Sequence, residues 1–447
     1  MMKIYHALLI LTVIFSACQK NDALMEDENQ PEDPPAQEEA ASRKKGLCLT
    51  LNRPDWPFRV AEAKVYWHYS WGNIFSEFEP DSVEFVPMIW GSARADGDTF
   101  NELKALKDEG KVRYLLGFNE PNGAEQANMT VEEAVALWPK LMELGVPLGS
   151  PAVAGTTIDN NWLKQFMTQV NQLGLRVDFI TVHQYSIDNV PNFIKSLQDL
   201  YDQYKLPLWI TEFAVADWSA KTAEENKYSH DFVLNFMKTL LPELEKLKFV
   251  HRYSWFGPPG WDKPALITSA LWDNDGKITP LGEFYAGFKP NENIGEGKST
   301  VGPIDPVNGF QDDFESYAAG ANLGRFGYLV WEGVARVISG DAYEGNKFGQ
   351  SNAADLNFAI RKTFTLEAGK TYRLEVATKN EDGLKHVIQV HPKTAYEAAW
   401  KDCFNADWEN HVTQFTVTTG NEEVTIALYR WQKKLLSFDH IRLTEVR

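Results

Sequence analysis

Cysteine is scarce in this sequence, with three residues among 447. Scaffolds that are held together by disulfides need a much higher cysteine density, so this class of fold is excluded. Cys48 lies in an apolar run, and Cys403 lies in a distant part of the chain. We therefore expect both to be free thiols that pack in the interior.

Basic residues are scarce relative to acidic ones. The chain has 44 lysines and arginines against 62 aspartates and glutamates, which gives a formal net charge of -18. Binding to a phosphate backbone requires a basic surface, so we expect no nucleic-acid partner. A neutral ligand would not be repelled by this charge.

Long hydrophobic runs are also missing. The apolar run at residues 7–15 is too short to span a bilayer and is typical of a secretory signal, and no other run is long enough for a transmembrane helix. Small residues then precede Cys18, which resembles a bacterial lipoprotein signal in which this cysteine is lipidated. We expect a signal peptide over residues 1–17 and an exported bacterial lipoprotein, anchored at the outer membrane or the cell surface. A plain signal peptide with an incidental cysteine is the alternative.

The segment after Cys18 has no apolar periodicity. Residues 19–41 are acidic and contain prolines, a composition that cannot form a packed core. We therefore predict a disordered tether over residues 18–45, between a lipid anchor and a folded domain.

From residue 46 onward, short apolar runs alternate with amphipathic segments. The chain is too long for one ordinary core, so two domains are expected. Eight runs with intervening helices, over roughly the 250 residues that such a fold needs, predict a (β/α)8 barrel at residues 46–290. The runs that we predict as strands are residues 46–50, 64–69, 85–90, 112–118, 146–152, 179–185, 208–213 and 249–255.

Helix signals accompany most of these runs. The strongest is at residues 131–144, where Thr130 is a candidate N-cap, Glu133 follows three residues later, and Gly145 stops the helix. The first two units have weak helix signals. The other predicted helices are residues 103–109, 162–173, 193–204, 223–240 and 281–288.

The pattern changes after the barrel. Residues 291–308 are rich in glycine and proline and are predicted to be a linker. Residues 309–447 contain runs that alternate at period two, with turns between them and little helix. This pattern predicts an all-β antiparallel sandwich of the jelly-roll type.

Two glutamates lie at the ends of apolar runs. Glu120 follows the fourth run and Glu212 ends the seventh, and in a parallel barrel the C-terminal strand ends form the site. Two carboxylates that face each other across the barrel mouth are the equipment for cleaving a glycosidic bond. A separation of about 5–5.5 Å gives retention, and one of about 6.5–9.5 Å gives inversion.

Other strand ends carry side chains that suit a sugar site. His183 and Tyr185 end the sixth run, Trp255 ends the eighth, and Trp90 ends the third. Broad aromatic surfaces can stack on sugar rings, although most tryptophans in a protein pack in its core. We add His68, in the second run, as a further candidate substrate contact.

The motifs around the two glutamates resemble those of glycoside hydrolase family 128, in the clan of retaining (β/α)8 glycosidases. They are Leu-Gly-Phe-Asn-Glu-Pro-Asn ending at Asn122, Ser-Pro-Ala ending at Ala152, and Thr-Glu-Phe-Ala ending at Ala214. The resemblance implies β-1,3-glucanase activity that needs no cofactor. It implies that Glu120 is the acid/base and Glu212 is the nucleophile.

The same resemblance extends to the residues around the glutamates. It implies that Asn119 contacts the sugar 2-hydroxyl, that Tyr185 supports Glu212, and that Trp255 and Trp90 stack on sugar rings.

The C-terminal sandwich resembles a jelly-roll carbohydrate-binding module. Such modules often hold a structural calcium ion, and Asp312, Glu315 and Asp439 are the candidate oxygen ligands, with ordinary surface charge as the alternative. Four tryptophans are expected either to stack on glycan or to pack in the core, namely Trp331, Trp400, Trp408 and Trp431.

Three functions remain in competition at this point. The first is a retaining, endo-acting hydrolase of β-1,3-glucan that works as a monomer. The second is a surface glycan-binding lipoprotein whose barrel has lost catalysis. The third is a hydrolase of another β-glycan, because groove shape, and not the catalytic pair, decides the linkage.

Overall fold

The computed structural model describes residues 43–51, 53–155, 157–185, 188–257, 263–305, 307–330, 335–352, 358–392, 398–430 and 434–446. The expected signal peptide, Cys18, most of the expected tether, Trp331 and Trp431 lie outside these residues. The described residues form three hydrophobic clusters, a large one between Leu47 and Tyr285, a small one between Cys48 and Trp209, and one between Phe314 and Leu443. None of the helices in the described part is both long and apolar enough to cross a membrane.

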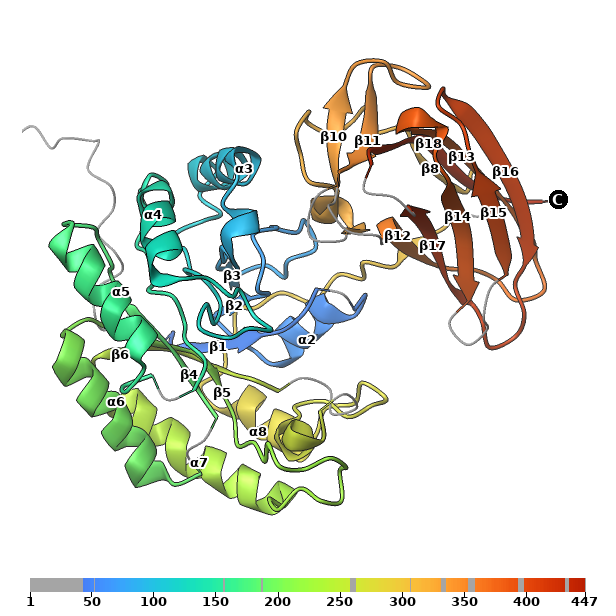
Figure 1. Ribbon diagram of the computed structural model, residues 1–447. Helices are drawn as coiled ribbons and strands as arrows, with labels where there is room; N and C mark the ends of the chain where they lie inside the picture. The colour runs from blue at the N-terminus through green and yellow to red at the C-terminus, as the bar shows by residue number, and fades with distance from the viewer. Residues whose placement is uncertain are drawn as a thin grey trace, which may run out of the picture.

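The first part is a closed parallel barrel (Figure 1). Six strands form a sheet in the order β3-β2-β1-β6-β5-β4, and two further segments complete the ring through isolated parallel bridges. The strands are β1 (Lys45–Cys48), β2 (Trp67–Tyr69), β3 (Glu84–Phe85), β4 (Ile180–Gln184), β5 (Leu208–Phe213) and β6 (Val250–Trp255). The bridges join Met88 to Leu116, Leu115 to Leu148, and Gly149 to Phe179. Eight segments therefore follow one another around the barrel in sequence order, and the predicted (β/α)8 class is confirmed.

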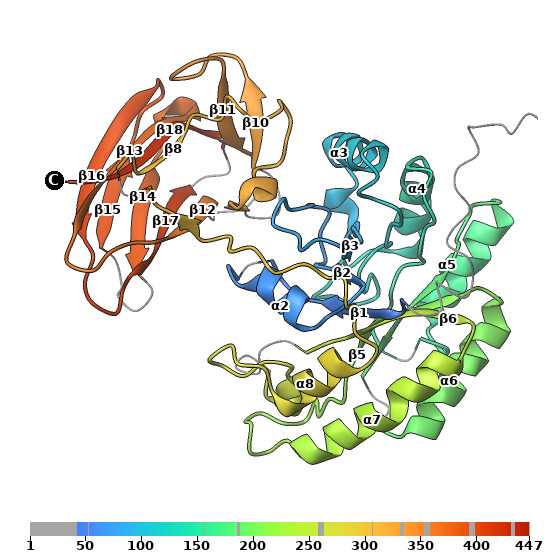
Figure 2. The ribbon, with the colours of Figure 1, turned by 180° about the vertical axis from the view of Figure 1, so that it is seen from behind.

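The helices form the outer layer of the barrel, as Figure 2 shows from behind. The capping box predicted for Thr130 and Glu133 is present at the start of α4 (Val131–Met142). Helix α7 (His230–Lys246) begins later than predicted, because the Ser229 side chain accepts a hydrogen bond from the amide of Phe232 and caps the helix there. The helices are α2 (Trp56–Glu62), α3 (Gly97–Asp108), α4 (Val131–Met142), α5 (Asn161–Gln172), α6 (Val190–Tyr204), α7 (His230–Lys246) and α8 (Pro280–Gly287).

Aromatic side chains fill the barrel interior. The guanidinium group of Arg252 lies 4.3 Å from the ring centre of Trp209 and 4.6 Å from that of Tyr114. Its charge is paired with Glu84 at 2.6 Å, as a largely buried cation requires. At Gly149 a side chain is excluded, because a Cβ atom would come within 2.4 Å of the Phe179 ring. The interior is thus packed, which leaves the strand ends as the place for a site.

The second unit of the barrel has no helix. Residues 70–83, between β2 and β3, are all described and form an irregular loop. Ile74 in this loop packs against the core of the C-terminal sandwich, and Glu77 pairs with Arg325 at 2.6 Å. The sandwich therefore lies where the missing helix would otherwise cover the barrel, next to α2 and α3 (Figures 1 and 2).

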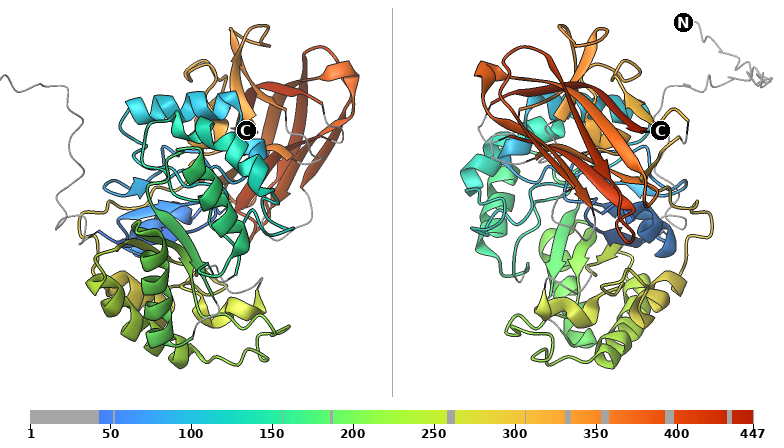
Figure 3. Two further views of the ribbon diagram at one scale, coloured as in Figure 1. Left: turned by 60° about the vertical axis from the view of Figure 1, so that its left-hand side comes forward. Right: turned by 90° about the vertical axis from the view of Figure 1, so that its right-hand side faces the viewer.

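The C-terminal part is a sandwich of two antiparallel sheets, seen from two sides in Figure 3. One sheet has the order β10-β11-β18-β13-β16 with β8 beside β18, and the other has the order β15-β14-β17-β12-β7 with β9 beside β12. The predicted barrel followed by an antiparallel sandwich is confirmed. The strands are β7 (Gly302–Pro303), β8 (Phe310–Asp312), β9 (Leu329–Val330), β10 (Ala335–Ser339), β11 (Lys347–Ser351), β12 (Phe358–Thr365), β13 (Thr371–Asn380), β14 (His386–Pro392), β15 (Ala399–Cys403), β16 (Glu409–Thr416), β17 (Glu423–Arg430) and β18 (Leu436–Glu445).

The segment at residues 291–308 connects the two parts and bonds to both of them. The Asn291 amide donates to the carbonyls of Val65 and Ser82 on the barrel, at 3.0 and 2.8 Å. Further along, β7 pairs with β12 of the sandwich. The segment predicted to be a linker is therefore held at several points.

Candidate active site

Glu120 follows the fourth barrel segment in a strained backbone conformation. Its amide donates to the carbonyl oxygen of Ala152 at 2.6 Å, and Asn119 forms a parallel bridge with the same residue. The φ angle of Glu120 is +44°, in the left-handed region that residues with a side chain rarely adopt. Strain of this kind is typical of functional positions that the surrounding structure holds in place.

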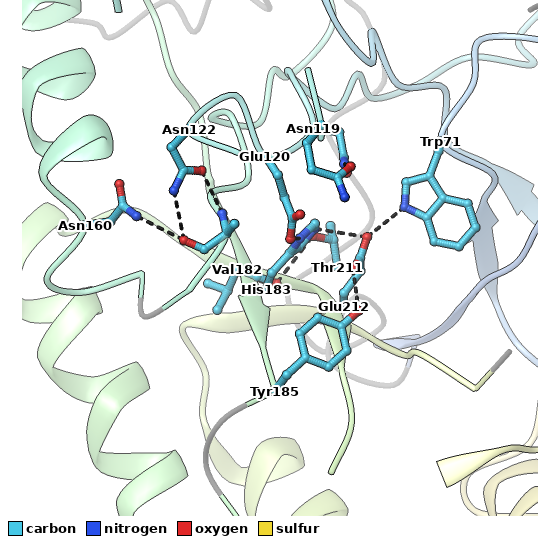
Figure 4. A network of polar contacts seen from close by, with 12 residues as sticks. Trp71, Asn119, Glu120, Asn122, Asn160, Val182, His183, Tyr185, Thr211 and Glu212 are labelled. Carbon is cyan, nitrogen blue, oxygen red and sulfur yellow. Dashed lines mark hydrogen bonds and ion pairs between the residues drawn. The ribbon is translucent and has the colours of Figure 1, made fainter. Parts of the chain in front are cut away.

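Glu212 lies in β5, and its carboxylate faces that of Glu120 (Figure 4). Oxygen atoms of the two carboxylates and a ring nitrogen of His183 lie within 4.8 Å of one another. His183 lies between the two acids, with Nδ1 at 2.9 Å from Glu120 and Nε2 at 3.3 Å from Glu212. The structure therefore brings together both predicted glutamates and the predicted histidine.

The carboxylate of Glu212 is held by several hydrogen-bond donors. Oε1 accepts from the indole nitrogen of Trp71 at 2.7 Å and from the hydroxyl of Tyr69 at 3.1 Å. Oε2 accepts from the hydroxyl of Tyr185. Donors on both oxygens fix the orientation of the carboxylate.

Glu120 is in a different environment. Among the described residues, its carboxylate has one side-chain partner, His183, and its side chain is 16% exposed against 8% for Glu212. One carboxylate is thus firmly held and the other is freer and closer to solvent. This difference in surroundings suits a pair of acids that have different roles.

The groups around the carboxylates have shifted pKa values. Burial lowers the pKa of His183, but the charge of Glu212 and the hydrogen bond with Glu120 outweigh burial, so the pKa lies above its usual value. Burial, reinforced by the charge of Glu212, raises the pKa of Tyr69 and of Tyr185 far above 10. Both phenols therefore remain hydrogen-bond donors over the whole working pH range.

Asn119 lies beside the pair and is 4% exposed. Its Nδ2 donates to Gln126 at 3.2 Å, and its Oδ1 has no hydrogen-bond partner among the residues that the structure describes. An unpaired buried acceptor next to the carboxylates can accept a hydrogen bond from a ligand hydroxyl. The side chain is thus placed as the predicted sugar contact requires.

Two of the predicted sugar contacts are wrong. Trp255 is fully buried, and its indole nitrogen donates to the carbonyl of Ser269 at 2.8 Å, so it has no surface on which a sugar could stack. His68 is also fully buried and pairs with Glu79 at 2.5 Å. Alternation along β2 turns Tyr69 toward Glu212 and sends His68 to the opposite face, into the packing around the barrel.

Trp90, in contrast, lines a groove between the barrel and the sandwich. The groove has a volume of about 500 Å³, and Trp71 lines it as well. Sequence reasoning missed Tyr69 and Trp71 as partners of Glu212. The alternation of β2 could have indicated Tyr69, whereas Trp71 follows the strand in the irregular loop and gave no signal. Trp218, which is 58% exposed and whose ring centre is 5.6 Å from that of Tyr185, was also missed.

Comparison with known proteins now decides the family. A model of the glycosyl hydrolase catalytic core matches residues 46–285, more than half of the chain. The chain belongs to this glycosyl hydrolase family. The matched residues are those of the barrel and include Asn119, Glu120 and Glu212.

Solved structures from glycoside hydrolase family 128 are similar to this barrel. An endo-β-1,3-glucanase of glycoside hydrolase family 128, subgroup I, from Amycolatopsis mediterranei is 31% identical over 55% of this chain and 99% of that chain, with a TM-score of 0.49. A subgroup II endo-β-1,3-glucanase from Sorangium cellulosum is 28% identical over 56% and 99% of the two chains, with a TM-score of 0.44. The resemblance to family 128 is confirmed by the identity with the Amycolatopsis chain, almost all of which is covered.

A curated relative is longer. Alkali-sensitive linkage protein 1 of Schizosaccharomyces pombe is 31% identical over 234 residues, which are 49% of this chain and 40% of that protein. The glycosyl hydrolase barrel thus spans less than half of the length of this yeast relative.

The candidate calcium ligands do not form one group in the described part of the chain. Asp312 accepts hydrogen bonds from two tyrosine hydroxyls at 2.7 and 2.9 Å, and Glu315 accepts from two backbone amides at 2.6 Å. Asp439 accepts from backbone amides at 2.7 and 3.0 Å. Each carboxylate is therefore already used by the sandwich, and calcium binding stays a prediction.

One other set of donors converges in the described residues. His386, Cys403 and His411 are buried in the sandwich, with ligand atoms within 4.8 Å of one another. Burial lowers the pKa of His386 to about 4 and raises that of Cys403 to about 12, so both are neutral at pH 7. Cys48 and Cys403 are free and buried, as predicted.

Two of the sandwich tryptophans can be placed. Trp400 is 41% exposed, and its indole donates to Asp402 at 2.8 Å. The indole of Trp408 donates to the carbonyl of Asp341 at 2.7 Å. Neither lines the groove beside the barrel site.

Proposed function

We propose that this protein hydrolyses β-1,3-glucan with retention of configuration, with Glu120 as the acid/base and Glu212 as the nucleophile. The observation that carries the proposal is the close approach of the two carboxylates, within 4.8 Å at their nearest oxygens. This separation favours direct attack by a carboxylate, because inversion needs about 6.5–9.5 Å to admit a water molecule. The two family-128 glucanases support the linkage.

The proposed first step breaks the glycosidic bond. A Glu212 oxygen attacks the anomeric carbon while protonated Glu120 gives its proton to the departing oxygen, and a glycosyl ester with Glu212 forms. Tyr69, Trp71 and Tyr185 hold the attacking carboxylate in one orientation, so little reorganisation is needed.

The proposed second step releases the sugar. Glu120, now ionised, takes a proton from water as that water attacks the same carbon, and Glu212 leaves as a carboxylate. Two successive inversions give net retention. His183 contacts both acids, so it can stabilise whichever one carries the charge.

Hydrolysis of laminarin, measured as new reducing ends, tests the activity. Internal cleavage predicts a rapid fall in viscosity and a mixture of oligosaccharides, whereas release of a single short product would replace the endo mode by an exo mode. A panel that includes β-1,4- and mixed-linkage glucan tests the linkage. If laminarin binds but stays intact, the protein is a glycan-binding member of the family.

The roles of the two acids can be separated by substitution. Glu120→Gln and Glu212→Gln should each lower kcat by at least about 10³-fold, since each removes a group that acts on the reacting atoms. Glu143→Gln, at an exposed glutamate after α4, is the matched control and should leave kcat unchanged.

Azide rescue assigns the roles directly. With an activated aryl β-glucoside, azide should restore turnover of Glu120→Ala with a β-glycosyl azide product, because Glu212 still forms the ester. Rescue of Glu212→Ala should give the α-azide. The opposite pattern would exchange the two roles.

We also propose that the chain is exported and lipidated at Cys18, on the basis of the short apolar run and the small residues before this cysteine. Metabolic labelling with an alkyne fatty acid should mark the wild-type protein and should not mark Cys18→Ala. Equal labelling of both would show that Cys18 does not carry the lipid anchor.

A further inference from the structure

The groove beside the catalytic pair is lined by both parts of the chain. On the barrel side it is lined by the loops after β1 and β2 and by Trp90. On the sandwich side it is lined by the segment at residues 327–330 and by side chains of β12 and β17. Its volume of about 500 Å³ lies in the range of sites that bind small molecules.

Trp71 connects this groove to the reaction centre. Its indole nitrogen donates to Glu212 at 2.7 Å, and the same side chain lines the groove. Trp90 also lines it, and the Trp90 carbonyl accepts from the amide of Asn119 at 2.9 Å. A ligand that extends from the carboxylates along Trp71 therefore enters the space between the two domains.

Several contacts fix the sandwich against the barrel. Arg336 pairs with Glu102 of α3 at 2.9 Å, and both side chains are largely buried. Arg325 pairs with Glu77 at 2.6 Å, and its carbonyl accepts from the Glu77 amide at 3.0 Å. Together with Ile74, which packs against the sandwich core, these contacts make the groove a fixed site shared by two domains.

The sandwich side of the groove is polar. Arg361 and Thr363 of β12 lie opposite Ala427 and Thr425 of β17, and the two threonine hydroxyls are 2.8 Å apart. Hydroxyl and guanidinium groups can exchange hydrogen bonds with the hydroxyls of a neutral sugar. The aromatic surfaces of Trp71 and Trp90 on the opposite side can stack on sugar rings.

We propose that the sandwich forms the distal end of the substrate groove and binds glucosyl residues of the same chain that is cleaved between Glu120 and Glu212. This inference rests on the proposed function and extends it. The sandwich then acts as part of the active site, and long glucans are favoured over short ones because only they reach β12 and β17.

A matched pair of variants tests the proposal. Thr425→Trp fills the groove, while Thr416→Trp alters an equivalent threonine pair, Thr371–Thr416, whose hydroxyls are also 2.8 Å apart but which lies outside the groove. The quantity to measure is kcat/KM for laminarihexaose divided by kcat/KM for laminaritriose. This ratio should fall about tenfold in Thr425→Trp, as expected when a pair of ordinary hydrogen bonds is lost, and should not change in Thr416→Trp.

Thermal unfolding of both variants shows whether they are folded, and Arg361→Ala supplies a second change on the same face without added bulk. An unchanged ratio in folded Thr425→Trp and in Arg361→Ala would overturn the proposal. So would an equal loss in Thr425→Trp and Thr416→Trp.

A binding experiment tests this proposal independently of the proposed hydrolytic function. In a Glu120→Gln background, calorimetric titration with laminarihexaose should show weaker binding when Thr425→Trp is added and unchanged binding when Thr416→Trp is added. If the wild-type protein cleaves no glucan, the proposed function fails, but this titration still decides whether the sandwich contributes to binding. Equal affinities in both double variants would overturn the contribution.

Discussion

The hydrogen bond between Trp71 and Glu212 offers a sharp test of how the proposed nucleophile is held. The substitution Trp71→Phe keeps an aromatic ring next to Tyr69 and Phe256, whose ring centres lie 5.5 and 5.8 Å away, but removes the indole donor at 2.7 Å from Glu212. Tyr69 and Tyr185 still hold the carboxylate, so the expected loss is that of one bond.

The magnitude follows from the charge on the acceptor. A hydrogen bond to an ionised group contributes about 1.5–3 kcal/mol. At 1.36 kcal/mol for each factor of ten in rate, the expected fall in kcat/KM is roughly 10- to 150-fold. The loss should appear in the step that forms the glycosyl ester, because that is the step in which we propose that Glu212 attacks.

The assay is kcat/KM for an aryl β-glycoside of laminaribiose, with burst kinetics to isolate ester formation. Trp162→Phe, on α5, is the matched control, because it removes an indole bond of 2.9 Å to the backbone carbonyl of Met129 and should leave kcat/KM unchanged. A folded Trp71→Phe enzyme with kcat/KM within twofold of wild type would refute the reasoning. A loss that lies entirely in KM would assign Trp71 to sugar binding instead.

Three further predictions follow from the structure. An NMR titration should show the pKa of the His183 imidazole above its usual value, and Glu212→Gln should lower that pKa, because the charge of Glu212 raises it. Since the pKa is higher in the folded state, His183 contributes to the stability of the fold. This contribution is complete below the unfolded pKa of about 6.5 and is lost as the pH rises through the folded pKa. Trp255→Ala should lower the free energy of unfolding by about 3–5 kcal/mol, as for a large buried aromatic, and denaturant titration would contradict its core position with a change below about 1 kcal/mol. Arg336→Ala should destabilise the protein by about 2–4 kcal/mol, because it leaves Glu102 buried without its partner, and the loss should shrink in a double variant with Glu102→Gln.

Much of the barrel and of its site could be predicted because local signals and the global fold agree there. The apolar runs before Glu120 and Glu212 end where their side chains reach the barrel mouth, and the capping box at Thr130 and Glu133 starts α4 where the sequence places it. His183 and Tyr185 were found for the same reason, since they end a strand beside β5.

Side-chain direction was harder to predict. The pairing of β4 with β5 shifts register between Val182 and His183, and that of β5 with β6 shifts between Ile210 and Phe213. A shifted register breaks the simple alternation of inward and outward residues. The prediction for Trp255 failed because the end of a strand does not itself reveal which face a side chain takes.

The structural consequence of the missing second helix could not be predicted from the sequence. Residues 70–83 gave a weak helix signal, but nothing local shows that the loop packs against a domain more than 200 residues later. Trp71 acquires its role from that loop, because the loop carries its indole to Glu212. Contacts between distant segments depend on tertiary packing, and local sequence patterns do not encode them.

The anomeric configuration of the first product tests the central claim most directly. Proton NMR during the first minutes of laminarioligosaccharide hydrolysis, before mutarotation, distinguishes the two anomers at the new reducing end. An oxygen of Glu120 within 4.8 Å of an oxygen of Glu212, with Glu212 as the proposed nucleophile, predicts the β-anomer first. Initial release of the α-anomer would contradict the account, because it would require a water molecule between the two acids.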